Sequence, residues 1–256
     1  MNEEKKELIK RWDDFLSKIT TRFRESLTHA EEACLEQLVT TDYDYETVMI
    51  SWGGIKIQIE QLINKIEKAW DNKVKKEMKA LGGNKRMDQK DKGSELVDRL
   101  DDELNEFERI LEGKIGMIFY DHAVQGAEKK YQCTQCNGDI YIRKDLFRTQ
   151  YISCNYCNTV NTIDMEVKFS IISSVIDPIA SMKAQSEYNV MKLSLKQLED
   201  QEKLTKETWL NYETAYYTYW ERFFTERIVL DADTEQRYDE DMERKKMELK
   251  KIKKRF

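Results

Sequence analysis

Helix-breaking residues are scarce in this chain of 256 residues, which contains a single proline and only 9 glycines. Glycine and proline punctuate β-sandwiches, barrels and doubly wound sheets, so their scarcity argues against those folds and for long helices. Charged residues make up 36% of the chain and hydrophobic residues 40%, a balance typical of amphipathic helices with broad solvated faces. We therefore expect a mainly α fold of long antiparallel helices in a bundle or coiled-coil-like arrangement.

Long apolar runs and histidines are also lacking. The N-terminal residues contain no apolar segment typical of a signal peptide, and the most apolar window, 169–182, is interrupted by Asp177 and Pro178. We therefore expect no membrane span and a cytoplasmic location. The chain has 2 histidines and none of the common nucleotide-binding, protease or hydrolase motifs. It is expected not to be an enzyme, and no small-molecule substrate is predicted.

Neither sign of charge dominates, since 43 basic and 49 acidic residues give a net charge of −6. Contact with nucleic acid would therefore need a local basic patch. The C-terminal sequence changes from acidic over 231–243 to basic over 244–255. This order complements the macrodipole of a helix, and it also suits a docking helix or a basic contact for an acidic partner.

Apolar residues recur every three or four positions in the first part of the chain, as in amphipathic helices. We predict an N-terminal helical hairpin over 1–81, with a turn in the sequence TTDYDYET capped by Asp or Thr. Gly53 and Gly54 interrupt the second helix and indicate a close crossing, a kink or a later helix start. Residues 82–94 contain three glycines and one apolar side chain, and are predicted to be a flexible linker.

Two further helical regions are predicted. The third helix of the bundle spans 95–128 with Ser94 as its cap, and its apolar stripe consists of Val97, Leu100, Leu104, Phe107, Leu111, Ile115 and Ile118. A C-terminal long-helix region spans 177–256, in which Asp177 would be the cap and Pro178 the first helical residue. A break in this region is expected near residue 231.

Half of the residues in the segment 209–224 are aromatic. They mark two adjacent faces of a helix, and so wide an apolar surface must be buried on two sides. Either this is the central helix of the bundle, or one face packs against a second chain, since tyrosine and tryptophan are favoured at interfaces. The candidate interface residues are Trp209, Tyr212, Tyr216, Tyr217, Tyr219, Trp220, Phe223 and Phe224.

Four of the 5 cysteines fall in two C-x2-C pairs separated by seventeen residues, and these are Cys133, Cys136, Cys154 and Cys157. The spacing is that of a four-cysteine zinc site, because two tight turns facing each other can place four sulfurs around one ion. We expect backbone N–H groups of each turn to point at the thiolates. Asn137 and Asn158 each follow the second cysteine of a pair, where a left-handed backbone is needed and asparagine tolerates it.

On these motifs, residues 131–163 resemble the zinc-ribbon class, and the opening Y-Q-C-T-Q-C-N-G-D-I-Y is also similar to rubredoxin, which holds iron in the same cage. The resemblance covers only this module. It implies a small inserted β zinc ribbon, predicted over 129–171, that holds a structural Zn2+ in preference to iron. The alternation of apolar and polar residues over 163–171 predicts a strand that extends the ribbon, although neighbouring apolar residues also allow a helix.

These features predict a non-enzymatic scaffold or interaction subunit of a larger assembly, with a protein partner or a homo-oligomer. The zinc ribbon would be a rigid docking element between helical segments. The alternative is a nucleic-acid-associated zinc-ribbon factor that uses the ribbon tip and the basic C-terminal tail. The tip would then contact phosphates and stack on bases, and its candidate residues are Arg143, Lys144, Phe147 and Arg148.

Overall fold

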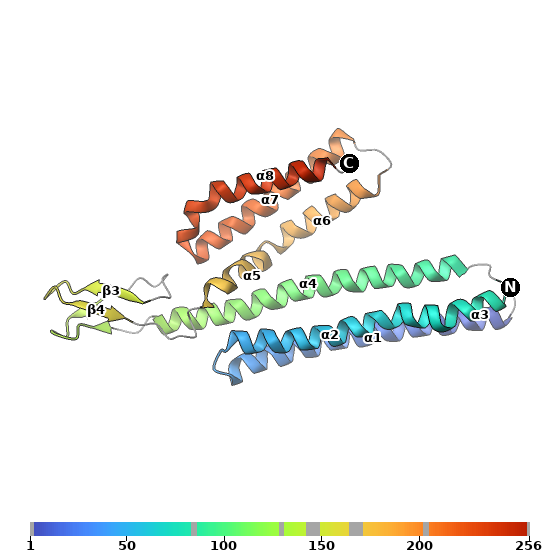
Figure 1. Cartoon of the computed structure of the whole chain (residues 1–256), viewed down its shortest axis with the longest axis horizontal. Helices are drawn as coiled ribbons and strands as arrows, with labels where there is room; N and C mark the ends of the chain where they lie inside the picture. The colour runs from blue at the N-terminus through green and yellow to red at the C-terminus, as the bar shows by residue number, and fades with distance from the viewer. Residues whose placement is uncertain are drawn as a thin grey trace. The chain divides into compact units, whose positions relative to one another are not determined.

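The computed structural model describes residues 3–82, 86–127, 131–141, 149–163, 171–201 and 205–254. Its residues fall into two compact units, Met1–Leu111 and Glu112–Phe256. Among the described residues, helices dominate both units and the β structure consists of two small two-stranded sheets (Figure 1). The expected mainly α fold with a small inserted β segment is therefore confirmed. Within the described ranges, no helix is both long and apolar enough to cross a membrane.

The first unit begins with the predicted helical hairpin (Figure 1). Its elements are α1 (Glu3–Thr40), α2 (Tyr45–Ala69), the π-helical turn η1 (Trp70–Val74), α3 (Lys75–Ala80) and the first part of α4 (Arg86–Ala127). Between α1 and α2, Asp42 and Tyr43 have left-handed φ angles of 52° and 61°. Asp44 then accepts the backbone N–H of Thr47 at 3.1 Å, so an aspartate caps α2 as expected.

The core of the first unit forms where the apolar stripes of its helices meet. Its largest fully buried side chains include Trp12, Phe23, Leu38, Trp52, Ile63, Ile66, Met78 and Leu100. The indole of Trp12 donates to the carbonyl of Gln89 at 3.1 Å, and the indole of Trp52 donates to Glu108 at 3.2 Å. These bonds join α4 to both helices of the hairpin, and they satisfy indole groups that burial would otherwise leave unpaired.

The predicted flexible linker over 82–94 is wrong for most of its length, because α4 begins at Arg86 rather than at Ser94. Gly93 lies inside this helix, and a Cβ atom there would come within 2.9 Å of the Trp12 ring. The glycine therefore permits close packing of α4 on α1 and does not mark a flexible segment. Residues 83–85 lie outside the described part of the chain.

Helix α2 runs without interruption through Gly53 and Gly54. A Cβ atom at either position would have nothing within 4 Å, so neither glycine allows a close crossing within this chain. The alternative of a later helix start is also wrong. Both glycines therefore lie in a helix interior that faces open space.

The buried stripe of α4 departs from the predicted one in the later part of the helix. Ile118 is 38% exposed, whereas Phe119 and Ala123 are fully buried. The buried positions Leu111, Ile115, Phe119 and Ala123 instead recur every four residues. The sequence pattern alone did not reveal this shift of the buried stripe.

The second unit contains the rest of α4, the β segment and the helices α5 (Ser173–Lys183), α6 (Gln185–Glu199), α7 (Lys206–Leu230) and α8 (Tyr238–Lys253). Helix α7 packs against α5, α6 and α8. Thr205 caps α7 through a reciprocal pair of hydrogen bonds with Thr208. The break expected near residue 231 is confirmed, because Asp231 is extended and the 3-10 helix η3 (Ala232–Arg237) separates α7 from α8.

Helix α5 begins at Ser173, so the prediction that Pro178 is its first residue is wrong. Buried Val175 extends the apolar face of the helix before the proline. The same helix packs closely on α4, where a Cβ atom at Gly113 would lie 2.3 Å from the Cβ of Met182. The helices that precede and follow the β segment in sequence are therefore in direct contact.

Candidate metal centre

Two short antiparallel hairpins carry the cysteine pairs. Strands β1 (Tyr131–Gln132) and β2 (Asp139–Ile140) form the first hairpin, and β3 (Gln150–Ser153) and β4 (Val160–Ile163) form the second. Each C-x2-C turn connects the two strands of one hairpin (Figure 1). Residues 164–170 lie outside the described part of the chain, so the choice between strand and helix over 163–171 stays open.

The sulfur atoms of the four cysteines all lie within 4.8 Å of one another. The shortest separations join one hairpin to the other, with 3.5 Å between Cys133 and Cys157 and 3.6 Å between Cys136 and Cys154. A tetrahedron of thiolates at the usual Zn–S distance has edges of about 3.8 Å. The four cysteines can therefore hold a metal ion, which is compatible with a zinc-ribbon segment.

The two cysteine turns have the same backbone geometry. The N–H of Asn137 donates to the carbonyl of Cys133 at 3.0 Å, and the N–H of Asn158 donates to that of Cys154 at 2.9 Å. The φ angles of the two asparagines are 55° and 59°, in the left-handed region. The predicted need for a residue that tolerates this conformation after each cysteine pair is confirmed.

Backbone N–H groups point at the sulfurs, as expected for a thiolate-binding turn. The N–H of Gln135 lies 3.5 Å from the sulfur of Cys133, and the N–H of Tyr156 lies 3.4 Å from that of Cys154. Donation from the backbone N–H groups of Cys136 and Gln135 lowers the pKa of Cys133 to about 6. The turn thus stabilises the thiolate form that a metal ion requires.

The other thiols differ in acidity. The hydroxyl and backbone N–H of Thr159 lower the pKa of Cys157. The backbone N–H of Gly138 also lowers the pKa of Cys136, but hydrogen bonding with Cys157 and Cys154 and partial desolvation outweigh it and raise that pKa to about 12. Metal binding must displace the protons that the thiols retain, including the proton of Cys136.

Asn161 is a residue of the site that sequence reasoning missed. It lies on β4, is 2% exposed, and donates from its side-chain nitrogen to the sulfur of Cys133 and to the carbonyl of Thr159. Its side-chain oxygen accepts the backbone N–H of Thr134 at 2.9 Å. One amide therefore connects both cysteine turns. A polar residue at an inward-facing position of the strand was the available signal.

Large side chains remain exposed on the same segment. Tyr141, Tyr151 and Tyr156 are 76%, 74% and 72% exposed, and Val160 is 60% exposed. The ring of Tyr156 covers Gly138, where a Cβ atom would lie 2.4 Å from the ring. Gly138 thus leaves room for contact between the two cysteine turns, while the outer faces of the tyrosines stay open to solvent.

The other residues predicted from the sequence to contact a partner differ in their positions in the structure. The ribbon-tip residues Arg143, Lys144, Phe147 and Arg148 lie outside the described part of the chain. The aromatic segment of α7 packs within its own unit, with Tyr217 and Trp220 partly buried and the other six residues buried. The hydroxyl of Tyr216 donates to the carbonyl of Lys245 on α8 at 3.2 Å. These aromatic side chains form an intrachain core, as in the first of the two alternatives.

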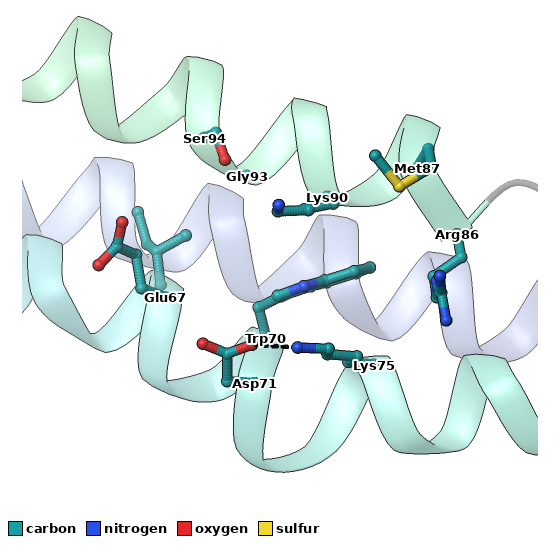
Figure 2. A pocket seen from close by; sticks show the side chains of 10 residues that line it. Glu67, Trp70, Asp71, Lys75, Arg86, Met87, Lys90, Gly93 and Ser94 are labelled. Atoms are coloured by element: carbon teal, nitrogen blue, oxygen red, sulfur yellow. Dashed lines mark hydrogen bonds and ion pairs between the residues drawn. The ribbon is translucent and has the colours of Figure 1, made fainter.

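Sequence reasoning also missed a pocket of about 420 Å3 in the first unit, beside η1 (Figure 2). Trp70 lies across it, between α4 and the turn, and the other lining residues are Ile66, Glu67, Asp71, Lys75, Arg86, Met87, Lys90, Gly93 and Ser94. Lys75 forms an ion pair with Asp71 at 3.0 Å. The lining mixes basic and acidic groups, which do not converge on one ligand chemistry.

No protein-family model, no curated protein and no solved structure matches this chain. The four cysteines are therefore a candidate metal centre on their own geometry alone, namely four sulfurs within 4.8 Å of one another, two turns with left-handed asparagines and backbone N–H groups aimed at sulfur.

Proposed function

We propose that the four cysteines bind a single Zn2+ ion with a structural role. An all-sulfur tetrahedron suits zinc and leaves no coordination position for a substrate, whereas catalytic zinc sites keep one position open. Iron fits the same geometry and is the less favoured ion. The ion would hold together two hairpins whose own core is small, consisting of Ile140 and two cysteines with partly buried neighbours. A cytoplasmic location suits this role, because reducing conditions keep thiols available for metal.

The function that the geometry supports best is a non-enzymatic scaffold or interaction subunit, in which the metal-bound ribbon docks onto a protein partner. The observation that carries this proposal is the exposure of Tyr141, Tyr151 and Tyr156, each more than 70% accessible on a segment that a metal would make rigid. Tyrosine is enriched in protein interfaces because it offers a large apolar area and a polar tip. A rigid platform also lowers the entropic cost of binding.

A nucleic-acid partner is the second candidate, because exposed tyrosines can also stack on bases. The basic end of α8 gives this candidate limited support. Lys245 lies over the Trp220 ring at 3.7 Å and Lys253 over the Trp209 ring at 4.8 Å, so both lysines pack within the chain. The basic residues predicted at the ribbon tip lie outside the described ranges.

The metal is tested by elemental analysis of the purified chain, for which we expect one zinc per chain. A visible absorption band would indicate iron, since zinc thiolate sites are colourless. The Cys154→Ser variant should lose the metal. The ribbon, a segment of roughly 35 residues, should then unfold and be cleaved by protease, while the helices stay intact. Cys34→Ala is the control, because Cys34 is buried in α1 and does not belong to the quartet. A Cys154→Ser variant with an intact ribbon would exclude the structural role.

The docking role is tested by cross-linking and capture from lysate of the source cells after nuclease treatment. A partner of the ribbon should be lost in the variant Tyr141→Ser, Tyr151→Ser and kept in Val229→Ser, a control at an exposed residue of α7. Capture that ignores the tyrosines contradicts the proposal. A salt-dependent gel shift that disappears in the variant Arg143→Glu, Arg148→Glu would instead support the nucleic-acid alternative.

A further inference from the structure

Helix α2 carries an apolar stripe on the side that faces away from its own bundle. Ile50 is 77% exposed and Ile57 is 55% exposed, whereas Trp52 and Ile59 are 2% exposed. At 100° per residue, each exposed isoleucine lies 200° around the helix from the buried residue two positions later. The two isoleucines therefore lie almost opposite the core, in a position where the rest of their unit cannot cover them.

The stripe is flat and uncharged at its centre. Gly53 and Gly54 lie one turn from each isoleucine, with nothing within 4 Å of where a Cβ atom would be. Gln61 continues the stripe and is exposed. In a chain with 36% charged residues, an exposed stripe that runs from Ile50 to Gln61 with no charged residue at its own positions requires an explanation. Glycine in a helix interior is also destabilising relative to alanine.

The stripe is symmetrical about the midpoint between its two glycines, reading Ile50, Gly53, Gly54, Ile57 in either direction. A two-fold axis through that midpoint would place Ile50 of one chain beside Ile57 of the other, twice, and the glycines beside one another. The isoleucines would then lie about 5 Å along the helix from the axis. An isologous interface requires such a self-complementary surface.

The charges that flank the stripe select the antiparallel arrangement. Exposed Glu46 lies toward the N-terminal end of α2, and exposed Lys65 and Lys68 lie toward its C-terminal end. In antiparallel pairing, Glu46 of one copy lies opposite Gln61 of the other copy. Lys65 of that other copy lies one helical turn further along, close enough to attract Glu46. Parallel pairing would place glutamate near glutamate and lysine near lysine, and would align the two helix dipoles unfavourably.

We propose that this stripe is a self-association surface, through which two copies of the chain pair by antiparallel packing of α2 on α2 around Gly53 and Gly54. The glycines let the helices approach closely, and the isoleucines fill the space on either side. The inference deepens the scaffold role and rests on it, since it gives that role a specific partner, a second copy of the chain. It involves neither the metal nor the tyrosines of the ribbon.

The first test measures the mass of the full-length, metal-loaded chain by light scattering from about 10 to about 300 µM. The mass should rise from 30.6 kDa toward twice that value, about 61 kDa. Ile57→Glu should weaken pairing about 100-fold or more, since the symmetry introduces the buried charge twice. Val229→Glu, at an equally exposed position on α7, should leave pairing unchanged. A monomeric mass throughout this range would overturn the proposal.

A charge pair tests the orientation. Ile50→Glu and Ile57→Lys should each abolish the dimer, while the double variant I50E/I57K should restore it, because antiparallel pairing opposes residue 50 to residue 57. Parallel packing would oppose glutamate to glutamate, so failure of the double variant to dimerise would overturn the antiparallel arrangement. Circular dichroism should be unchanged in every variant, because both positions are exposed.

Disulfide cross-linking gives an independent test. Ile50→Cys alone should not cross-link, whereas I50C/I57C should form a covalent dimer rapidly under mild oxidation. Cys34 is 1% exposed and does not interfere. Cross-linking by Ile50→Cys alone would indicate a parallel pair and contradict the proposal. None of these measurements depends on the ribbon. Failure of the dimer proposal can therefore be distinguished from failure of the proposal that a partner binds at the tyrosines.

Discussion

The side-chain nitrogen of Asn161 donates to the sulfur of Cys133 over 3.5 Å, although the two residues are 28 positions apart in sequence. The same amide accepts from Thr134 and donates to the carbonyl of Thr159, so it positions both cysteine turns at once. Partners of this kind, which hold metal ligands without touching the ion, contribute substantially to metal affinity.

We expect Asn161→Ala to lower zinc affinity by about 10-fold to 100-fold, because Cys133 loses a donor and the two turns lose their common partner. Competition with a coloured chelator measures this affinity. Thr162→Ala is the matched control, since Thr162 is exposed and next in the same strand, and its affinity should equal that of the parent chain. Equal affinities for Asn161→Ala and the parent would show that the amide does not support the site.

The glycines of α4 and α2 should respond to alanine with opposite signs. Gly113→Ala forces a Cβ atom toward Met182 and the Pro178 carbonyl, and such overpacking costs about 1–3 kcal/mol. Gly53→Ala meets open space and should stabilise its helix by up to about 1 kcal/mol. Urea unfolding of dilute protein measures both changes. Stabilisation by Gly113→Ala would contradict the close packing of α4 on α5.

The ion pair between Arg227 and Asp241 joins α7 to α8, and both residues are buried. Asp241→Asn should destabilise the second unit by about 3–5 kcal/mol, because it leaves a buried guanidinium without its carboxylate. Glu243→Gln is the control on the same helix, where the pair with Lys246 is solvent-exposed and contributes little to stability. Urea unfolding followed by tryptophan fluorescence compares the variants, and similar losses for both would contradict this account.

Alkaline pH should destabilise the helices around α7. Burial raises the pKa of Tyr216 above its ordinary value, and burial likewise raises the pKa of Tyr212. Above pH about 10 the unfolded chain loses these protons while the folded chain keeps them. The stabilisation is therefore fully present below that pH and is lost as pH rises further.

The measurement is the free energy of unfolding in urea at several pH values between about 9 and about 11. Tyr216→Phe should flatten the decline, and it should cost about 1 kcal/mol at neutral pH because the bond to the Lys245 carbonyl is lost. A variant that declines as steeply as the parent would show that Tyr216 does not titrate as described.

Local sequence was sufficient for the features that depend on neighbouring residues. The limits of α1, the Asp44 cap and the left-handed conformations of Asn137 and Asn158 all follow from a few adjacent side chains and the backbone conformations that they allow. The grouping of the four cysteines belongs to the same class, because C-x2-C spacing fixes how two sulfurs leave one tight turn. For such features the sequence determines the structure directly.

Only the tertiary structure decided features that depend on distant residues. In the sequence Gly93 is typical of a linker, and only the structure shows that it packs against Trp12. In the sequence Asn161 is an ordinary polar residue of a strand, and only the structure shows that it contacts both cysteine turns. The sequence allowed the aromatic face of α7 to pack against a second chain, whereas in the structure α5, α6 and α8 pack against α7. The periodicity of a helix or strand in the sequence indicates whether one of its faces is apolar or polar. It does not indicate which segment covers that face, because burial depends on neighbours in space that are distant in sequence.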